Sequence, residues 1–113
     1  MAGWKGNIDR LEAEKRLETQ TIGTYILHRP EEVIEDLVSH LSQVNHMAVE
    51  CYLITIKDVG EKIAEQLLLR TNRGWTIYQD NPNLNDLECY SYFHSLQEAL
   101  RSLEPRAKKP LED

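Results

Sequence analysis

The strongest hydrophobic pattern in this sequence lies over residues 31–44, where apolar side chains recur at the spacing of an α-helix. The stripe comprises Val33, Ile34, Leu37, Val38, Leu41 and Val44. Pro30, just before the stripe, suits the first position of a helix and interrupts strand pairing. The pattern therefore predicts an amphipathic helix over residues 31–44.

Two further helices are predicted from capping residues that precede apolar positions. Asp9 with Glu12, and Ser95 with Glu98, have the spacing of a capping box, in which side chains bond the exposed backbone N–H groups of the first turn. These pairs predict two helices, over residues 9–17 and 95–103.

Four segments rich in β-branched and aromatic residues predict strands, over residues 25–29, 48–57, 62–71 and 75–78. Short turns join the last three, which should form an antiparallel meander. The sequence therefore predicts an α+β fold: a central antiparallel sheet flanked by two helices, with an extra helix inserted after the first strand. The domain should span residues 4–103, and the polar residues 104–113 should form a flexible tail.

Charge and composition argue against several classes of protein. The 113 residues suffice for one domain, and 19 acidic against 13 basic residues give a net charge of −6. A nucleic-acid-binding protein would need a basic face. No apolar run approaches the roughly 18–20 residues of a membrane span, and no signal-peptide pattern is present. We therefore expect a cytoplasmic monomer that binds neither nucleic acid nor membrane.

The cysteines and histidines do not form a pattern typical of a metal or catalytic site. Cys51 and Cys89 have no partner motif and are expected to be reduced thiols. His40, His46 and His94 lack ligand spacing with either cysteine. Nucleophilic catalysis by a Cys89–His94 pair would need a third, orienting group, which the sequence does not indicate. We expect no enzyme activity, no cofactor and no metal.

Basic side chains at the end of the first predicted strand indicate an anion site. Gly23 opens an apolar run, and His28 and Arg29 follow where this buried strand reaches the surface. Arg10 lies in the first turn of a predicted helix, where a cation opposes the helix dipole by roughly a few tenths of a kcal/mol. Arg10 is therefore either a solvated side chain or one placed to meet an anion.

Five blocks of the sequence follow one another in an informative order. They are an opening segment with Trp4, Gly6 and Arg10, then residues 23–27, 67–70, 74–77 and 93–98. In this order they resemble the Src-homology-2 domains, which bind phosphotyrosine, and the order is more specific than any single block. The resemblance covers residues 4–103 and implies a module that binds tyrosine-phosphorylated proteins or peptides in intracellular signalling.

The chain departs from that family at the residue that binds phosphate. The family places an arginine directly after the apolar triplet, whereas this chain has His28, followed by Arg29. In an alignment without a gap, His28 is the residue that binds the phosphate. A local bulge would instead bring Arg29 into the pocket. A guanidinium is permanently charged and grips phosphate through two parallel bonds, whereas a neutral imidazole offers one donor. Arg29 is therefore the first candidate for the phosphate-binding residue, and His28 is the alternative.

A second departure concerns the selectivity of the module. The helix over residues 31–44 stands where the family has a short, hydroxyl-rich loop around the phosphate, and the sequence predicts no counterpart of the family's loop and strand after the last helix. The resemblance therefore implies low selectivity for the sequence that flanks the phosphotyrosine. This combination is similar to Src-homology-2 domains in effectors of intracellular bacterial pathogens, which act in the host cytosol.

The resemblance also implies roles for individual residues. Arg10 and Arg29, or His28 in its place, would hold the phosphate, and Arg10 would also cover the tyrosine ring. The peptide would cross the third strand near Gln66 and Leu68. Part of the stripe on the inserted helix is a candidate lid over the ring, or else packs on the sheet: Val33, Leu37 and Leu41.

The alternative function is an interaction domain with a degenerate pocket, which binds partners without phosphate. His28 at the arginine position is the feature that favours it. The exposed part of the inserted helix would then be the interface, in a helix-in-groove contact.

Overall fold

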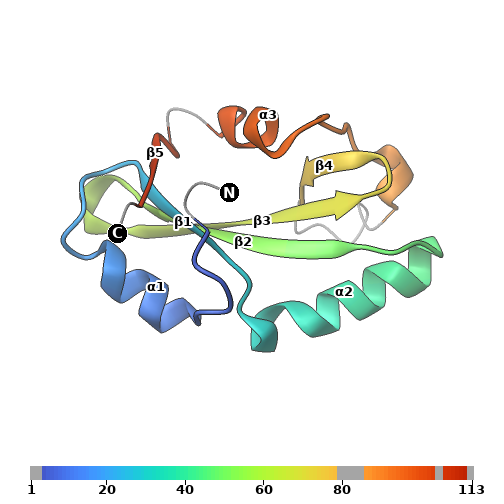
Figure 1. The fold of residues 1–113 in the computed structure, drawn as a ribbon, viewed down its shortest axis with the longest axis horizontal. Coiled ribbons are helices and arrows are strands. Elements are labelled where there is room, and N and C mark those ends of the chain that lie inside the picture. Colours follow the sequence, from blue (N-terminus) through green and yellow to red (C-terminus); the bar gives the residue numbers. More distant parts are fainter. Residues whose placement is uncertain (1–3, 79–85, 104–105, 112–113) are drawn as a thin grey trace.

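A five-stranded sheet with the strand order β4-β3-β2-β1-β5 forms the centre of the computed structural model (Figure 1). The strands are β1 (Thr24–His28), β2 (Glu50–Lys57), β3 (Ile63–Thr71), β4 (Gly74–Ile77) and β5 (Lys109–Pro110). The structure describes residues 4–78, 86–103 and 106–111, and of residues 31–33, 61 and 89 it describes the backbone alone. Strands β1 to β4 pair antiparallel, and β5 pairs parallel to β1.

Three α-helices cover the two faces of this sheet (Figure 1). Helices α1 (Arg10–Leu17) and α2 (Glu31–Asn45) lie on one face, and α3 (Leu96–Arg101) lies on the other. Single turns of 3-10 helix, Val59–Glu61 and Leu87–Cys89, complete the described elements. The predicted α+β class is confirmed, with element ends shifted by a residue or two. In the part of the chain that the structure describes, no helix combines the length and apolar character needed to span a membrane.

The strand alternation divides the core into two layers. On the α3 face, Leu27, Ile54 and Leu68 pack with the aromatic rings of Tyr52 and Trp75. On the opposite face α1 covers Ile26 with Ala13 and Leu17, and α2 packs Ile34 and Leu41 on Cys51, Leu53 and Leu69. Two helices thus share one face of the sheet and meet near the end of β1.

The helix predicted after the first strand is confirmed, and its end is fixed by specific bonds. His46 takes up a left-handed conformation with φ 52°, a conformation that often ends a helix. The Asn45 side chain donates to the carbonyl of Leu41 at 2.9 Å and accepts from the N–H of Leu87 at 2.9 Å. This asparagine therefore ties the end of α2 to a segment 42 residues further along the chain.

Two separate segments cover the outer edge of β1. The N–H of Lys5 donates to the carbonyl of Leu27 at 2.9 Å, and that of Arg29 donates to Gly6 at 2.9 Å. Nearer the start of the strand, β5 takes the same edge, and Leu111 donates its N–H to Tyr25 at 2.8 Å. An edge covered in this way offers no open backbone for pairing with another chain.

The sequence predicts a flexible tail over residues 104–113, whereas in the structure residues 106–111 lie against the sheet. Gly23, with φ +95°, accepts at its carbonyl from the N–H groups of Lys108 and Lys109. The side chains of Ala107 and Leu111 are 3% and 7% exposed. Two apolar side chains among polar neighbours are too weak a pattern to predict a strand, and backbone pairing with Gly23 and Tyr25 supplies the rest. The sheet is consequently mixed rather than wholly antiparallel.

Replacing Leu111 with alanine tests this packing. Removing a buried leucine side chain should lower the free energy of unfolding by about 2 kcal/mol. The matched control is Leu11→Ala, because Leu11 is 76% exposed and its loss should cost within about 0.5 kcal/mol. Urea unfolding followed by circular dichroism measures both values, and equal losses in the two variants would contradict the packed arrangement.

Candidate functional site

The residues proposed to bind an anion lie near the seam between α1 and α2. On this face of the sheet β1 presents His28, β2 presents Thr55 and β3 presents Glu65, and Thr55 and Glu65 are cross-strand partners. Arg10, the first residue of α1, reaches Glu65 across the seam. Two of the predicted site residues, Arg10 and His28, are therefore brought to one place.

His28 is completely buried and bonded at both ring nitrogens. Its Nδ1 lies 2.9 Å from the carbonyl oxygen of Ile8, and its Nε2 lies 2.7 Å from Oγ1 of Thr55. Because a carbonyl can only accept, Nδ1 carries the proton, and in the neutral ring Nε2 accepts from the Thr55 hydroxyl. Burial lowers the pKa of His28, against the opposing effects of the Ile8 carbonyl, Glu65 and Asp9. His28 is thus a neutral group that joins three segments.

Arg10 is held by a carboxylate of the same chain. Its Nε donates to Oε2 of Glu65 at 2.6 Å, and its Nη2 donates to the other oxygen, Oε1. This bidentate bond is the main cause of the raised pKa of Arg10. The pair also offsets the cost of a cation in the first turn of α1. A phosphate could bind the Nε and Nη2 edge of the Arg10 guanidinium only by displacing Glu65.

Arg29 follows the last residue of β1 and lies near the start of β2. Burial raises the pKa of Cys51, on the face covered by α2, and of Tyr52, on the α3 face, and the charge of Arg29 opposes both increases. The pairing of β1 with β2 runs without a bulge from Tyr25 to His28. Within β1 it is therefore His28 that lies on the same face of the sheet as Arg10.

The side chain of Arg29 is half-buried, and it makes no hydrogen bond or ion pair with the side chains that the structure describes. Its backbone N–H is bonded to the carbonyl of Gly6 at 2.9 Å. Among the described carboxylates, none occupies this guanidinium as Glu65 occupies that of Arg10.

The two predicted peptide-binding residues point toward the α3 layer. Leu68 is fully buried in that layer and cannot be reached from solvent. Gln66 is half-buried, and its Nε2 donates to the carbonyl of Tyr78 at 2.9 Å. In this arrangement Gln66 supports the pairing of β3 with the segment after β4.

The candidate lid packs on the sheet. Leu41 is fully buried and Leu37 is partly buried, and both contact the layer that contains Leu53 and Leu69. The side chain of the third candidate, Val33, lies outside the described residues. The described part of the stripe thus holds α2 against β2 and β3.

Sequence reasoning missed Glu65 and Thr55, which complete this site. A signal was present, because Ile63, Leu67 and Leu69 alternate on one face of β3 and Glu65 is the charged residue among them. A carboxylate at such a position needs a cationic partner, and Arg10 supplies it. Among the described residues there is no group of three histidine, cysteine or acidic side chains that could hold a metal ion.

The burial of neutral His28 predicts a pH-dependent stability. Because the folded pKa is lowered, the unfolded chain takes up a proton first as the pH falls through about 6.5. The stability that depends on neutral His28 is therefore present above that pH and is lost below it. Urea unfolding at pH values of about 7.5 and 5 should show a smaller acid loss in His28→Gln than in the wild type.

His40→Gln is the matched control, because it makes the same change on an exposed side chain of α2. It should keep the wild-type difference between the two pH values. Equal acid losses in the wild type and His28→Gln would show that His28 does not carry this dependence.

No protein-family model matches this chain, and no curated protein matches it either. Its function is therefore inferred from the geometry of the site.

Proposed function

We propose that this chain is a Src-homology-2-like interaction domain that binds partner proteins without requiring phosphate. One observation carries the proposal: the position that would meet a phosphate is filled from within, by the carboxylate of Glu65 on Arg10. His28, at the family's arginine position, is neutral and has both nitrogens engaged. An incoming dianion would meet the carboxylate of Glu65 here, and the ring of His28 is buried out of its reach.

The arrangement of the elements supports the likeness to that family. A helix, a strand, a three-stranded meander and a helix follow one another, and the first and last helices lie on opposite faces of the sheet (Figure 1). This is the order that the five sequence blocks imply once α2 is treated as an insertion. The parallel strand β5 adds a contact at the edge of β1.

Electrostatics support binding without phosphate. A phosphotyrosine carries about −1.5 to −2 charges, and its binding relies on charge-assisted bonds of roughly 1.5–3 kcal/mol each. Beside Glu65 that charge would be repelled, and displacing the carboxylate from Arg10 would leave a half-buried acid without its partner. Gln66 and Leu68 add no positive charge on β3.

The proposed interface is the outer surface of α2. Its buried positions face the sheet, which leaves Glu35, Asp36, His40, Gln43 and Val44 exposed. Val44 is 50% exposed and provides an apolar contact at the end of this surface, whose beginning is acidic. A partner with a groove that is apolar at one end and basic at the other would complement it.

Phosphotyrosine-peptide binding is the second candidate, and the state of Arg29 is the observation that favours it. This half-buried guanidinium has no ion pair or side-chain hydrogen bond within the described residues. In this version Arg29 alone binds the phosphate, near the start of β2, and the phosphotyrosine supplies most of the affinity.

Titration with a phosphotyrosine peptide and its unphosphorylated twin separates the two functions. We expect the two affinities to agree within about threefold, because no charge-assisted bond distinguishes the peptides. A preference of more than about tenfold for the phosphopeptide, abolished by Arg29→Ala, would overturn the proposal in favour of the second candidate. The exposed cation Arg101 provides the matched control, Arg101→Ala, which should change neither affinity.

Glu65→Gln tests whether the carboxylate keeps phosphate away from Arg10. Removing its charge should raise the affinity for the phosphopeptide about tenfold or more, the value of one charge-assisted bond. The double variant Glu65→Gln with Arg10→Ala should lose this gain.

The matched control for that gain is Glu88→Gln, which removes the carboxylate from another arginine pair, Arg73–Glu88. It should leave phosphopeptide affinity at the wild-type value. No gain in Glu65→Gln, or an equal gain in Glu88→Gln, would show that Glu65 does not control access to Arg10.

A further inference from the structure

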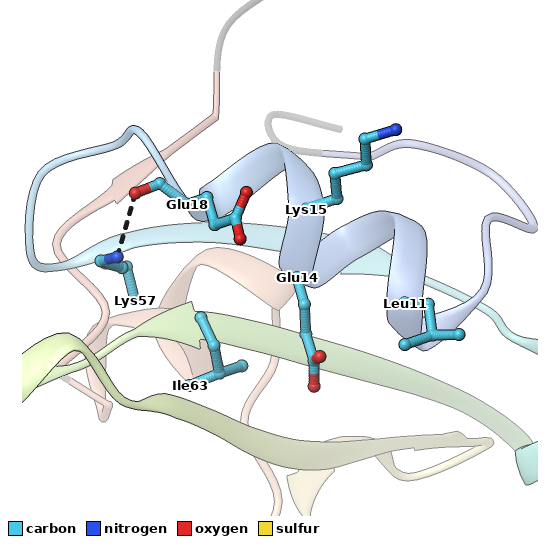
Figure 2. Close-up of a pocket in the computed structure, with 6 residues that line it drawn as sticks. All are labelled: Leu11, Glu14, Lys15, Glu18, Lys57 and Ile63. Atoms are coloured by element: carbon cyan, nitrogen blue, oxygen red, sulfur yellow. Dashed lines mark hydrogen bonds between the residues drawn. The ribbon is translucent and has the colours of Figure 1, made fainter.

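A hollow of about 330 Å³ lies beside α1 (Figure 2). It is bounded by one side of the helix, the end of β2 and the beginning of β3. Six residues line it: Leu11, Glu14, Lys15, Glu18, Lys57 and Ile63. Since a water molecule occupies about 30 Å³ of liquid, the hollow has room for an extended side chain.

Two carboxylates line this hollow. Glu14 lies on α1, where it acts electrostatically on Arg10, and Glu18 is the C-cap of the helix, four residues further on (Figure 2). Neither carboxylate has a hydrogen bond or ion pair with any residue that the structure describes. By contrast, Glu12 on the same helix pairs with Arg16 at 3.0 Å. Glu18 is exposed at the C-terminal end of α1, where the helix dipole disfavours an anion and an external cation would offset that cost.

The two lysines that line the hollow do not neutralise these acids. Lys57 is 4% exposed, and its Nζ donates to the backbone carbonyl of Glu18 at 3.1 Å, where the end of α1 favours a cation. Lys15 points away from the hollow in Figure 2. The carboxylates are therefore the charged groups directed into the space.

The remaining lining is apolar. Leu11 is 76% exposed, the largest exposed fraction among the large hydrophobic residues that the structure describes. Ile63 is half-buried below the helix. An aliphatic chain with a cationic end matches this combination, because its methylene groups can cover Leu11 and Ile63 while its charge reaches the acids.

We propose that the hollow binds a lysine or arginine side chain of a partner protein. The aliphatic stem lies on Leu11 and Ile63, and the ammonium or guanidinium group pairs with Glu14 and Glu18. The inference rests on the proposed function only in taking the partner to be a protein. The partner would thus contact two sites on this chain, the hollow beside α1 and the outer surface of α2.

Small-molecule probes can test binding to the hollow before the partner protein is identified. The ¹⁵N-labelled chain is titrated with Nα-acetyl-lysine N-methylamide and with the norleucine and glutamate analogues, and amide shifts are followed by nuclear magnetic resonance. The lysine probe should shift amides around Leu11, Glu14, Glu18 and Ile63 and should bind at least about threefold more tightly than norleucine, which lacks the charge. Shifts confined to α2, or tighter binding of glutamate, would overturn the proposal.

Variants assign the effect to the two acids. Glu14→Gln with Glu18→Gln should weaken the lysine probe at least about threefold, because two exposed charge contacts are lost. Glu12→Gln, a charge change on the same helix but outside the hollow, should leave it unchanged. Equal weakening in both variants would contradict the site. The peptide-twin titration tests the proposed function separately, since its outcome does not depend on these probes.

Discussion

A buried imidazole between the first helix and the sheet is the constraint on which much of this structure depends. His28 joins β1 to the entry of α1 through the Ile8 carbonyl and to β2 through Thr55. Because both nitrogens are bonded, the ring can be buried at little cost as long as it stays neutral. This bond and the packing of Ala13 and Leu17 on Ile26 hold α1 against the sheet, where Arg10 reaches Glu65.

The inserted helix shares one face of the sheet with α1 (Figure 1). It packs through Ile34 and Leu41 on β2 and β3, and the polar residues of the seam lie on the same face, beside α1. A neutral histidine and an internally paired arginine fit such a seam, since neither leaves an unbalanced charge in it.

The sequence predicted the parts of the fold that have local signals. The stripe on α2, the Asp9 and Ser95 caps and the β-branched strands each leave a periodic or spaced pattern, and each element is found. Side-chain partnerships across distant segments leave no such pattern. The pair of Arg10 with Glu65 spans 55 positions, and β5 depends on backbone bonds to Gly23 rather than on its own composition. The choice between His28 and Arg29 likewise depended on strand register, which the residues alone left open.

The cover on the outer edge of β1 has a consequence for the order of folding during synthesis. The segment around Lys5 and Gly6 is made before β1 and can cover the C-terminal end of that strand as soon as the strand is made. The N-terminal end of β1 stays uncovered until residues 109–111 leave the ribosome, after every other described element has been made. Through most of synthesis, backbone groups around Gly23 and Tyr25 are therefore open to mispairing with other nascent chains. Closing this edge is a late step that joins segments more than 80 residues apart, which makes it slow relative to formation of the β2–β3 hairpin.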